Sequence, residues 1–223
     1  MSDMIFAARQ VNGLRRGIWQ KGLRLQNISF ELPAGYIMGI VGKNGAGKTT
    51  FFDYIMQDKK CYTGELLLEG REIHQNHQQA LDRIGFVSEK NRFMELRSAL
   101  QNAQMLGRFY SFFDKELFRD ILEKGKVSEH KIITEMSRGE QMKFQLAFAV
   151  AHKPKVFLLD EVTAGMDPVF RLDFYGLLHL LIKEEDCSVI LSTHIEEEIE
   201  KQLDFVGVLE EGRWVSFGEN KLI

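Results

Sequence analysis

Short apolar runs alternate with longer stretches of helical spacing along this chain of 223 residues. Residues 28–32 alternate apolar and polar side chains, as a half-buried strand does. The later apolar runs have the length of buried strands and cover residues 36–41, 84–87, 156–159 and 189–191. Residues 139–152 and 168–183 have the spacing of helices. Strands that alternate with helices predict an α/β fold with a mostly parallel sheet covered on both faces.

Residues 94–136 differ from the rest because they have a helical composition and lack a strand candidate. We therefore expect one domain over residues 1–223, with a helical subdomain at about 94–136 inserted into the α/β core. The inserted region carries Phe109, Tyr110, Phe112 and Phe113, for which core packing is the first expectation and a partner-docking face the alternative. Residues 205–217 predict two short strands. An acidic run is expected on the exposed side of a helix: Glu196, Glu197, Glu198 and Glu200.

Composition and charge narrow the class of protein. With 44% hydrophobic and 27% charged residues, the chain is too apolar for a disordered protein and too charged for a membrane protein. No apolar run reaches the roughly 18 residues of a membrane span, and the first residues lack the features of a secretory signal. Cys61 and Cys187 match no metal or redox spacing. A net charge of −3 argues against a nucleic-acid partner, so we expect a cytosolic protein without one.

Residues 42–49 match the phosphate-loop pattern G-x-x-x-x-G-K-[ST] in full, between an apolar run and a predicted helix. Glycines let the backbone curl, so that successive N–H groups face the phosphates of a nucleotide. Lys48 adds a positive charge, and the Thr49 hydroxyl is a ligand suited to Mg²⁺. A plain glycine-rich turn is the alternative. The residues expected to bind the nucleotide here are Gly42, Lys43, Asn44, Gly45, Ala46, Gly47, Lys48, Thr49 and Thr50.

Residues 156–161 are four apolar residues followed by two carboxylates. A buried strand that ends in an aspartate is how phosphate-loop ATPases hold Mg²⁺, which assigns that role to Asp160. Glu161 would then orient or deprotonate the attacking water. Strands often end in acidic residues, so this pattern alone is weak evidence for a magnesium site. Downstream of a complete phosphate loop, it becomes strong evidence.

Three further segments follow in order. Ser137-Arg138-Gly139-Glu140-Gln141 begins a predicted helix, Ala164-Gly165-Met166-Asp167 follows the carboxylate pair, and Ser192-Thr193-His194 ends the last apolar run. Together with the phosphate loop, they make nearly the whole chain similar to the ATP-binding cassette (ABC) ATPases. The first segment resembles the family signature L-S-G-G-Q, with Arg138 in place of the first glycine and Glu140 in place of the glutamine. The other two resemble the D-loop and the switch-histidine segment.

The resemblance implies a phosphate-loop NTPase (RecA-like) core with an N-terminal antiparallel β subdomain, and ATP and Mg²⁺ as cofactors. It also implies a second ATP-binding subunit, expected to be an identical copy, whose ATP is contacted by Ser137, Gly139 and Glu140. His194 would contact the γ-phosphate. Trp19 lies where the family places an aromatic residue on the adenine, although a surface or core role is the alternative.

One position departs from the family in a way that bears on the chemistry. The family has a glutamine, the Q-loop residue, after the strand at 84–87, where this chain has Ser88-Glu89. The Glu89 carboxylate is able to join Thr49 and Asp160 as a ligand of Mg²⁺, but it cannot donate a hydrogen bond as an amide does. With a glutamate at this position, the chain resembles the cassettes of small bacterial exporters whose membrane subunits are separately encoded.

These observations predict an ATP-binding and ATP-hydrolysing subunit of an ABC transporter, with export favoured over import. Its partner would be a separately encoded integral membrane subunit, which would hold the chain at the cytoplasmic face of the membrane. The alternative is a non-transport ABC ATPase that acts on ribosomes or DNA. Glu89 and Ser137 are only 48 residues apart, too close for the long coiled coils of DNA-repair members. The transported substrate is not predicted.

Overall fold

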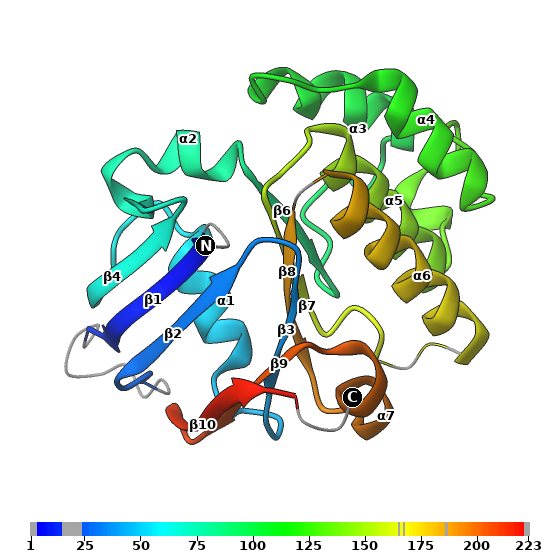
Figure 1. Ribbon diagram of the computed structural model, residues 1–223. Helices are drawn as coiled ribbons and strands as arrows, with labels where there is room; N and C mark the ends of the chain where they lie inside the picture. Colours follow the sequence, from blue (N-terminus) through cyan, green and yellow to red (C-terminus); the bar gives the residue numbers. More distant parts are fainter. Residues whose placement is uncertain (1–3, 15–23, 165, 167, 186, 221–223) are drawn as a thin grey trace.

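The computed structural model describes residues 4–14, 24–164, 166, 168–185 and 187–220. Its strands form two sheets, and helices lie between and around them (Figure 1). The strands are β1 (Met4–Gly13), β2 (Ile28–Pro33), β3 (Ile37–Val41), β4 (Tyr62–Leu68), β5 (Arg71–Glu72), β6 (Ile84–Ser88), β7 (Val156–Asp160), β8 (Ser188–Thr193), β9 (Phe205–Glu210) and β10 (Arg213–Glu219). The helices are α1 (Lys48–Met56), α2 (His77–Leu81), α3 (Ala99–Leu106), α4 (Lys115–Lys124), α5 (Arg138–Ala151), α6 (Pro168–Glu185) and α7 (Glu196–Gln202).

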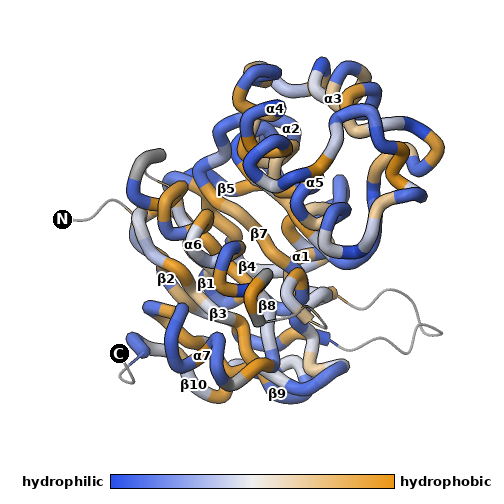
Figure 2. The backbone as a smooth tube through the Cα atoms, turned by 90° about the vertical axis from the view of Figure 1, so that its right-hand side faces the viewer, coloured by the Kyte–Doolittle hydropathy of each residue, from blue (hydrophilic) through white to orange (hydrophobic). Residues whose placement is uncertain are grey.

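The larger sheet has the strand order β10-β9-β3-β8-β7-β6, and all its strands are parallel except β10. Both of its faces are buried. In β7, Val156 and Leu158 belong to one apolar cluster, and Phe157 and Leu159 belong to another on the opposite face. Figure 2 shows hydrophobic residues along the central strands. Burial on both faces explains why these strands are continuously apolar in sequence, and it confirms the predicted parallel core.

The smaller sheet is antiparallel, with the order β2-β1-β4-β5. It packs toward the parallel sheet with α1 between them, whereas α5 and α6 lie on the other side of the parallel sheet (Figure 1). The contact is aromatic: the ring of Phe51 in α1 lies 5.7 Å from that of Phe30 in β2, and the ring of Phe52 in α1 lies 6.4 Å from that of Phe86 in β6. The phosphate-loop helix is therefore anchored against both sheets.

The region 94–136 contains α3 and α4 and no strand. Ser98 caps α3 and Asp114 caps α4, each by accepting hydrogen bonds from backbone N–H groups of the first turn. Phe118 of α4 belongs to the same buried cluster as Phe144 of α5 and Phe157 of the sheet, so the helices share a core with the sheet. The division into an inserted subdomain stays a prediction.

The aromatic group of this region divides between core and surface. Tyr110 and Phe113 pack against the buried cluster, as expected for core residues. Phe109 is 74% exposed and Phe112 is 51% exposed, so core packing is wrong for these two. Within the described residues, no helix combines the length and the apolar character needed to cross a bilayer.

Candidate functional site

The predicted phosphate loop connects the end of β3 to the start of α1. Gly47 precedes α1 with a φ of 114°, a left-handed conformation that favours glycine, and no side chain caps the helix there. Gly42 is needed for a different reason, because a Cβ on it would lie 2.3 Å from the carbonyl oxygen of Leu209. The uncapped N-terminus of α1 leaves its N–H groups for an anion.

Lys48 is buried beneath the loop, with only 4% of its surface exposed. Its ammonium donates to the carbonyl oxygens of Gly42 at 2.7 Å and Lys43 at 3.3 Å. The Glu161 carboxylate lies 3.0 Å from the same ammonium. The two residues with the most direct predicted roles in ATP chemistry are therefore paired with each other in the structure.

Asp160 ends β7 within a buried network of hydroxyl groups. Thr49 donates to Asp160 Oδ2 at 2.9 Å, and Ser192 of β8 donates to Asp160 Oδ1 at 2.7 Å. Burial raises the pKa of Asp160, and the charges of Glu161 and Asp53 raise it further, while the two hydroxyl donors oppose the shift. A positive ion at this carboxylate would lower the pKa again and stabilise the charged form.

The residues present fit a magnesium ion better than a metal that needs many protein ligands. Thr49 and Asp160 supply hard oxygen donors side by side, and Mg²⁺ is held by one or two such groups plus phosphate oxygens. In the part of the chain that the structure describes, no group of three or more His, Cys, Asp or Glu side chains forms a metal site by itself.

Glu161 has a left-handed backbone with a φ of 51°. Non-glycine residues seldom adopt this conformation, and it concentrates at functional sites. Its backbone N–H donates to the Ser192 hydroxyl at 2.9 Å, the same hydroxyl that bonds Asp160. Ser192 thus fixes both carboxylate residues, and the sequence analysis did not assign it this part.

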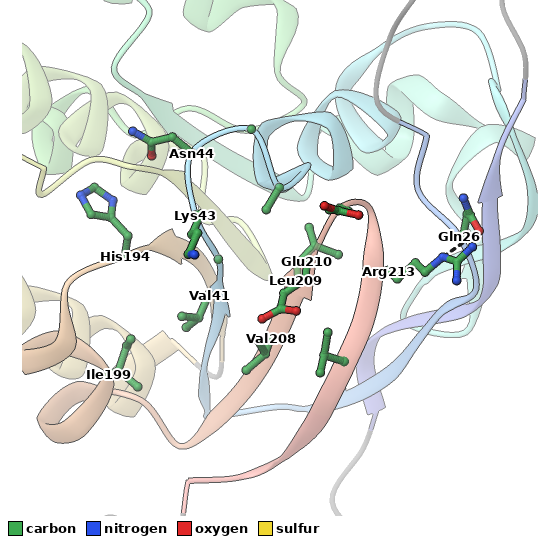
Figure 3. Close-up of a pocket in the computed structure, with 15 residues that line it drawn as sticks. Gln26, Val41, Lys43, Asn44, His194, Ile199, Val208, Leu209, Glu210 and Arg213 are labelled. Atoms are coloured by element: carbon green, nitrogen blue, oxygen red, sulfur yellow. Dashed lines mark hydrogen bonds between the residues drawn. The ribbon is translucent and has the colours of Figure 1, made fainter.

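A pocket of about 1110 Å³ opens beside the phosphate loop (Figure 3). The loop from Gly42 to Ala46 forms one wall, together with His194, which follows β8 and is exposed. The hairpin of β9 and β10 forms the opposite wall and is joined to the loop by the Gly212 N–H, which donates to the Ala46 carbonyl at 2.9 Å. Arg213 and Gln26 are hydrogen-bonded at the far end. The volume suits a small-molecule ligand.

One member of the acidic run does not lie on the surface. Glu198 is only 3% exposed and accepts a hydrogen bond from the Thr193 hydroxyl, which in turn accepts from the Ile195 N–H at 3.1 Å. Burial, and then Glu198, raise the pKa of Tyr175. The expectation of an exposed helix side is wrong for Glu198, because this carboxylate holds the backbone on either side of His194.

The signature segment forms the N-terminus of α5, as expected. The Ser137 hydroxyl accepts from the Glu140 N–H at 3.3 Å, and the Glu140 carboxylate accepts from the Ser137 N–H at 2.8 Å. Lys131 lies 2.8 Å from Glu140 and, with the Ser137 N–H, holds the pKa of that carboxyl below its usual value. Ser137, Gly139 and Glu140 do not line the pocket beside the phosphate loop.

Glu89 is not brought to the predicted metal ligands by any contact in the structure. It follows β6 and its carboxylate lies 3.2 Å from the guanidinium of Arg138, the first residue of α5. Trp19 lies outside the described residues, as do Gly165 and Asp167 of the predicted D-loop. Met166 packs against the buried cluster under α5 and α6.

A second cavity of about 410 Å³ lies between the parallel core and the helical region. Phe86, Arg92 and Phe93 line it from the segment around Glu89, and Phe109 and Tyr110 line it from the helical region. We refer to this cavity as the groove. Its floor includes His152, whose ring stacks on Tyr110 with the centroids 4.1 Å apart.

The groove gives the chain a specific sensitivity to acid. Burial lowers the pKa of His152 from 6.5 to about 4. The folded chain therefore excludes a proton that the unfolded chain accepts, and stability is lost as the pH falls from 6.5 through 4. At about 1.4 kcal/mol per pKa unit, the loss is about 3 kcal/mol. Denaturant unfolding of wild type and His152→Gln at pH 7 and pH 4 measures it.

In His152→Gln, we expect the drop in unfolding free energy between pH 7 and pH 4 to be smaller than in wild type by about this amount. His130→Gln, at a histidine whose side chain is 77% exposed, serves as the control and should follow wild type. Parallel pH curves for all three proteins would contradict a buried neutral His152.

The parallel sheet, the phosphate loop at the end of β3 and the carboxylates at the end of β7 define a phosphate-loop NTPase. A family model described as ABC transporter matches residues 25–164. The chain therefore belongs to the ABC transporter family. This confirms the family and the fold class predicted from the sequence.

Two relatives are similar to this chain in sequence, and one solved structure is similar to it in fold. The bacitracin transport ATP-binding protein BcrA of Bacillus licheniformis is 29% identical over 191 residues, which are 85% of this chain and 62% of BcrA. The uncharacterized ABC transporter ATP-binding protein MJ1023 of Methanocaldococcus jannaschii is 32% identical over 87% of this chain and 71% of its own length. A solved ATP-binding subunit of an ABC transporter has a TM-score of 0.84 at 18% identity and covers 96% of this chain and 90% of its own. The chain spans less than two thirds of BcrA.

Proposed function

We propose that this chain hydrolyses ATP and drives transport across a membrane as the peripheral subunit of an ABC transporter. The observation that carries the proposal is the arrangement around the phosphate loop, where Lys48, Glu161 and the Thr49–Asp160 pair converge. The pocket beside the loop has room for the rest of a nucleotide. The Gly47 turn and the uncapped start of α1 suit phosphates.

The residues around the phosphate loop then have roles that their positions support. Lys48 and the loop N–H groups bind the β- and γ-phosphates, and Glu161 orients and deprotonates the attacking water. Thr49 and Asp160, with Glu89 as a third ligand, would hold Mg²⁺, which neutralises phosphate charge when it is bound. His194 contacts the γ-phosphate. Trp19 lies outside the described residues, and its stacking on the adenine is proposed from the family resemblance alone.

Two copies of the chain complete each site. Ser137, Gly139 and Glu140 lie away from the chain's own pocket, at an exposed helix N-terminus that suits an anion. We place this N-terminus on the γ-phosphate bound to the partner copy. ATP would then bind the closed pair more tightly than the open pair, and its binding shifts the equilibrium toward closure.

The groove is the surface that suits the membrane subunit. Aromatic and apolar side chains line it beside charged ones, and Phe109 on its rim is exposed. A segment of the membrane subunit seated there would touch both the segment around Glu89 and the helical region, and it would hold the chain at the cytoplasmic face. Export as the direction is supported by the glutamate at position 89, and the likeness to a bacitracin transport protein supports the class of transporter.

Purification of the tagged chain from membranes in mild detergent tests the proposal. We expect one integral membrane protein to co-purify in a fixed ratio with the wild-type chain. Phe109→Asp should release that protein because it places a charge in an apolar contact, whereas Phe112→Asp, at an exposed ring that does not line the groove, should retain it. Co-purification with ribosomes or DNA, and with no membrane protein, would favour the alternative.

A further inference from the structure

Two of the positions at which the motifs depart from the family are in contact with each other. Arg138 replaces the first glycine of the signature, and Glu89 replaces the Q-loop glutamine. An Arg138 Nη2 atom lies 3.2 Å from Glu89 Oε1. Their side chains are 43% and 56% exposed, so this ion pair is in reach of solvent. If the chain carried only one of these two departures from the family, its charge would lack this partner. With both present, the two charges form a pair.

A second contact joins the same two segments and differs in kind. The side-chain amide of Gln145 in α5, only 3% exposed, accepts from the Ser88 N–H at 3.1 Å and donates to the Ser88 carbonyl at 3.0 Å. These two buried hydrogen bonds fix the end of β6 on α5. One residue later, the exposed ion pair of Glu89 holds the segment that leaves the strand.

Two other charged residues close to this pair along the chain have different partners. Glu140, two residues further along α5, is held by Lys131 at 2.8 Å and by the Ser137 N–H. Arg92, on the same segment as Glu89, lies 3.6 Å from Asp53 instead. A cation in the first turn of a helix is also opposed by the helix dipole. The attraction to Glu89 offsets the unfavourable interaction of the Arg138 charge with the helix dipole.

We propose that Glu89 and Arg138 form a latch, an ion pair that holds the segment after β6 against the N-terminus of α5 until ATP binds. The proposal rests on the function proposed above, since it assumes that Glu89 turns toward the phosphates when ATP binds. The latch holds Glu89 at Arg138, as in the structure. ATP binding must then break the pair, so the latch opposes it, and both residues act as positioning residues.

Hydrogen exchange in the nucleotide-free chain tests the latch without ATP. An exposed pair of this kind shifts a local equilibrium about two- to fivefold. We expect amides of residues 89–93 and of the first turn of α5 to exchange faster by that factor in both Glu89→Gln and Arg138→Gln. The double variant should be no faster than either single variant, and the reversed pair Glu89→Arg/Arg138→Glu should restore slow exchange. Exchange rates unchanged in the single variants, or additive in the double variant, would overturn the latch.

Hydrolysis kinetics test its effect on ATP. Arg138→Gln breaks the pair and keeps the Glu89 carboxylate, so the KM for MgATP should fall about two- to fivefold. Glu89→Gln also replaces the charged carboxylate ligand by a neutral amide oxygen, which attracts Mg²⁺ less, so its rate should require more Mg²⁺ than that of Arg138→Gln. An unchanged KM in Arg138→Gln, with hydrolysis intact, would overturn the positioning role. Absence of hydrolysis in every protein, wild type included, would contradict the proposed function instead, while hydrogen exchange still decides the latch.

Discussion

Glu161→Gln is expected to lower the rate of ATP hydrolysis about a hundredfold or more while ATP still binds. The amide has nearly the same shape as the carboxylate but cannot accept a proton from water. The structure adds an expectation about binding. Glu161 lies 3.0 Å from the Lys48 ammonium in the structure, where the phosphates of ATP would compete with it. Without the negative charge, the affinity for ATP should be equal to or higher than that of wild type.

Phosphate release and ATP binding, measured on the same preparations, check both parts. Glu123→Gln is the matched control, since Glu123 is exposed on α4, outside the nucleotide pocket. It should hydrolyse ATP as wild type does. A Glu161→Gln protein that retains most of the wild-type rate would remove Glu161 from the proposed role.

Lys48→Met should lower the affinity for ATP about thirtyfold or more, which corresponds to a loss of about 2 kcal/mol. Methionine is of similar length and fills the buried space, so the fold should survive. In wild type, the Lys48 ammonium would exchange its partners Gly42, Lys43 and Glu161 for phosphate oxygens of ATP. The variant lacks this ammonium. The two variants therefore separate two steps: Lys48→Met loses binding, and Glu161→Gln loses turnover.

Titration with a fluorescent ATP analogue measures the affinity, and a thermal unfolding curve shows whether the variant is folded. Lys59→Met is the control, because Lys59 is exposed beyond the end of α1. A folded Lys48→Met protein with wild-type affinity would mean that the ammonium does not face the phosphates.

The parts of the fold with a local signal in the sequence could be predicted. The strands of the parallel sheet are short apolar runs because both faces are buried, as the two clusters around β7 show. The phosphate loop and the carboxylate pair are each contiguous in sequence and directly follow an apolar run. Each motif can therefore be placed once the one strand before it is predicted. The structure places Lys48 and Thr49, at the start of α1, beside Asp160 and Glu161, at the end of β7.

The rest depends on contacts between distant residues. In sequence, Glu198 looks like one of several surface glutamates. In the structure it is buried against Thr193 and Tyr175, which belong to other elements. Ser192 and Gln145 are ordinary polar residues in sequence, yet each fixes the backbone of a motif residue through buried hydrogen bonds. The sequence does not predict the contact of Glu89 with Arg138, because nothing in it places the start of that helix beside the end of β6.

The central claim is that ATP closes two copies of this chain on each other, and the molar mass of Glu161→Gln tests it most directly. Light scattering after gel filtration should give a mass near that of a single chain, 25.8 kDa, without nucleotide or with ADP. With ATP and Mg²⁺, the mass should double, because hydrolysis no longer reopens the pair. A protein that binds ATP and keeps the mass of one chain at every concentration would contradict the account.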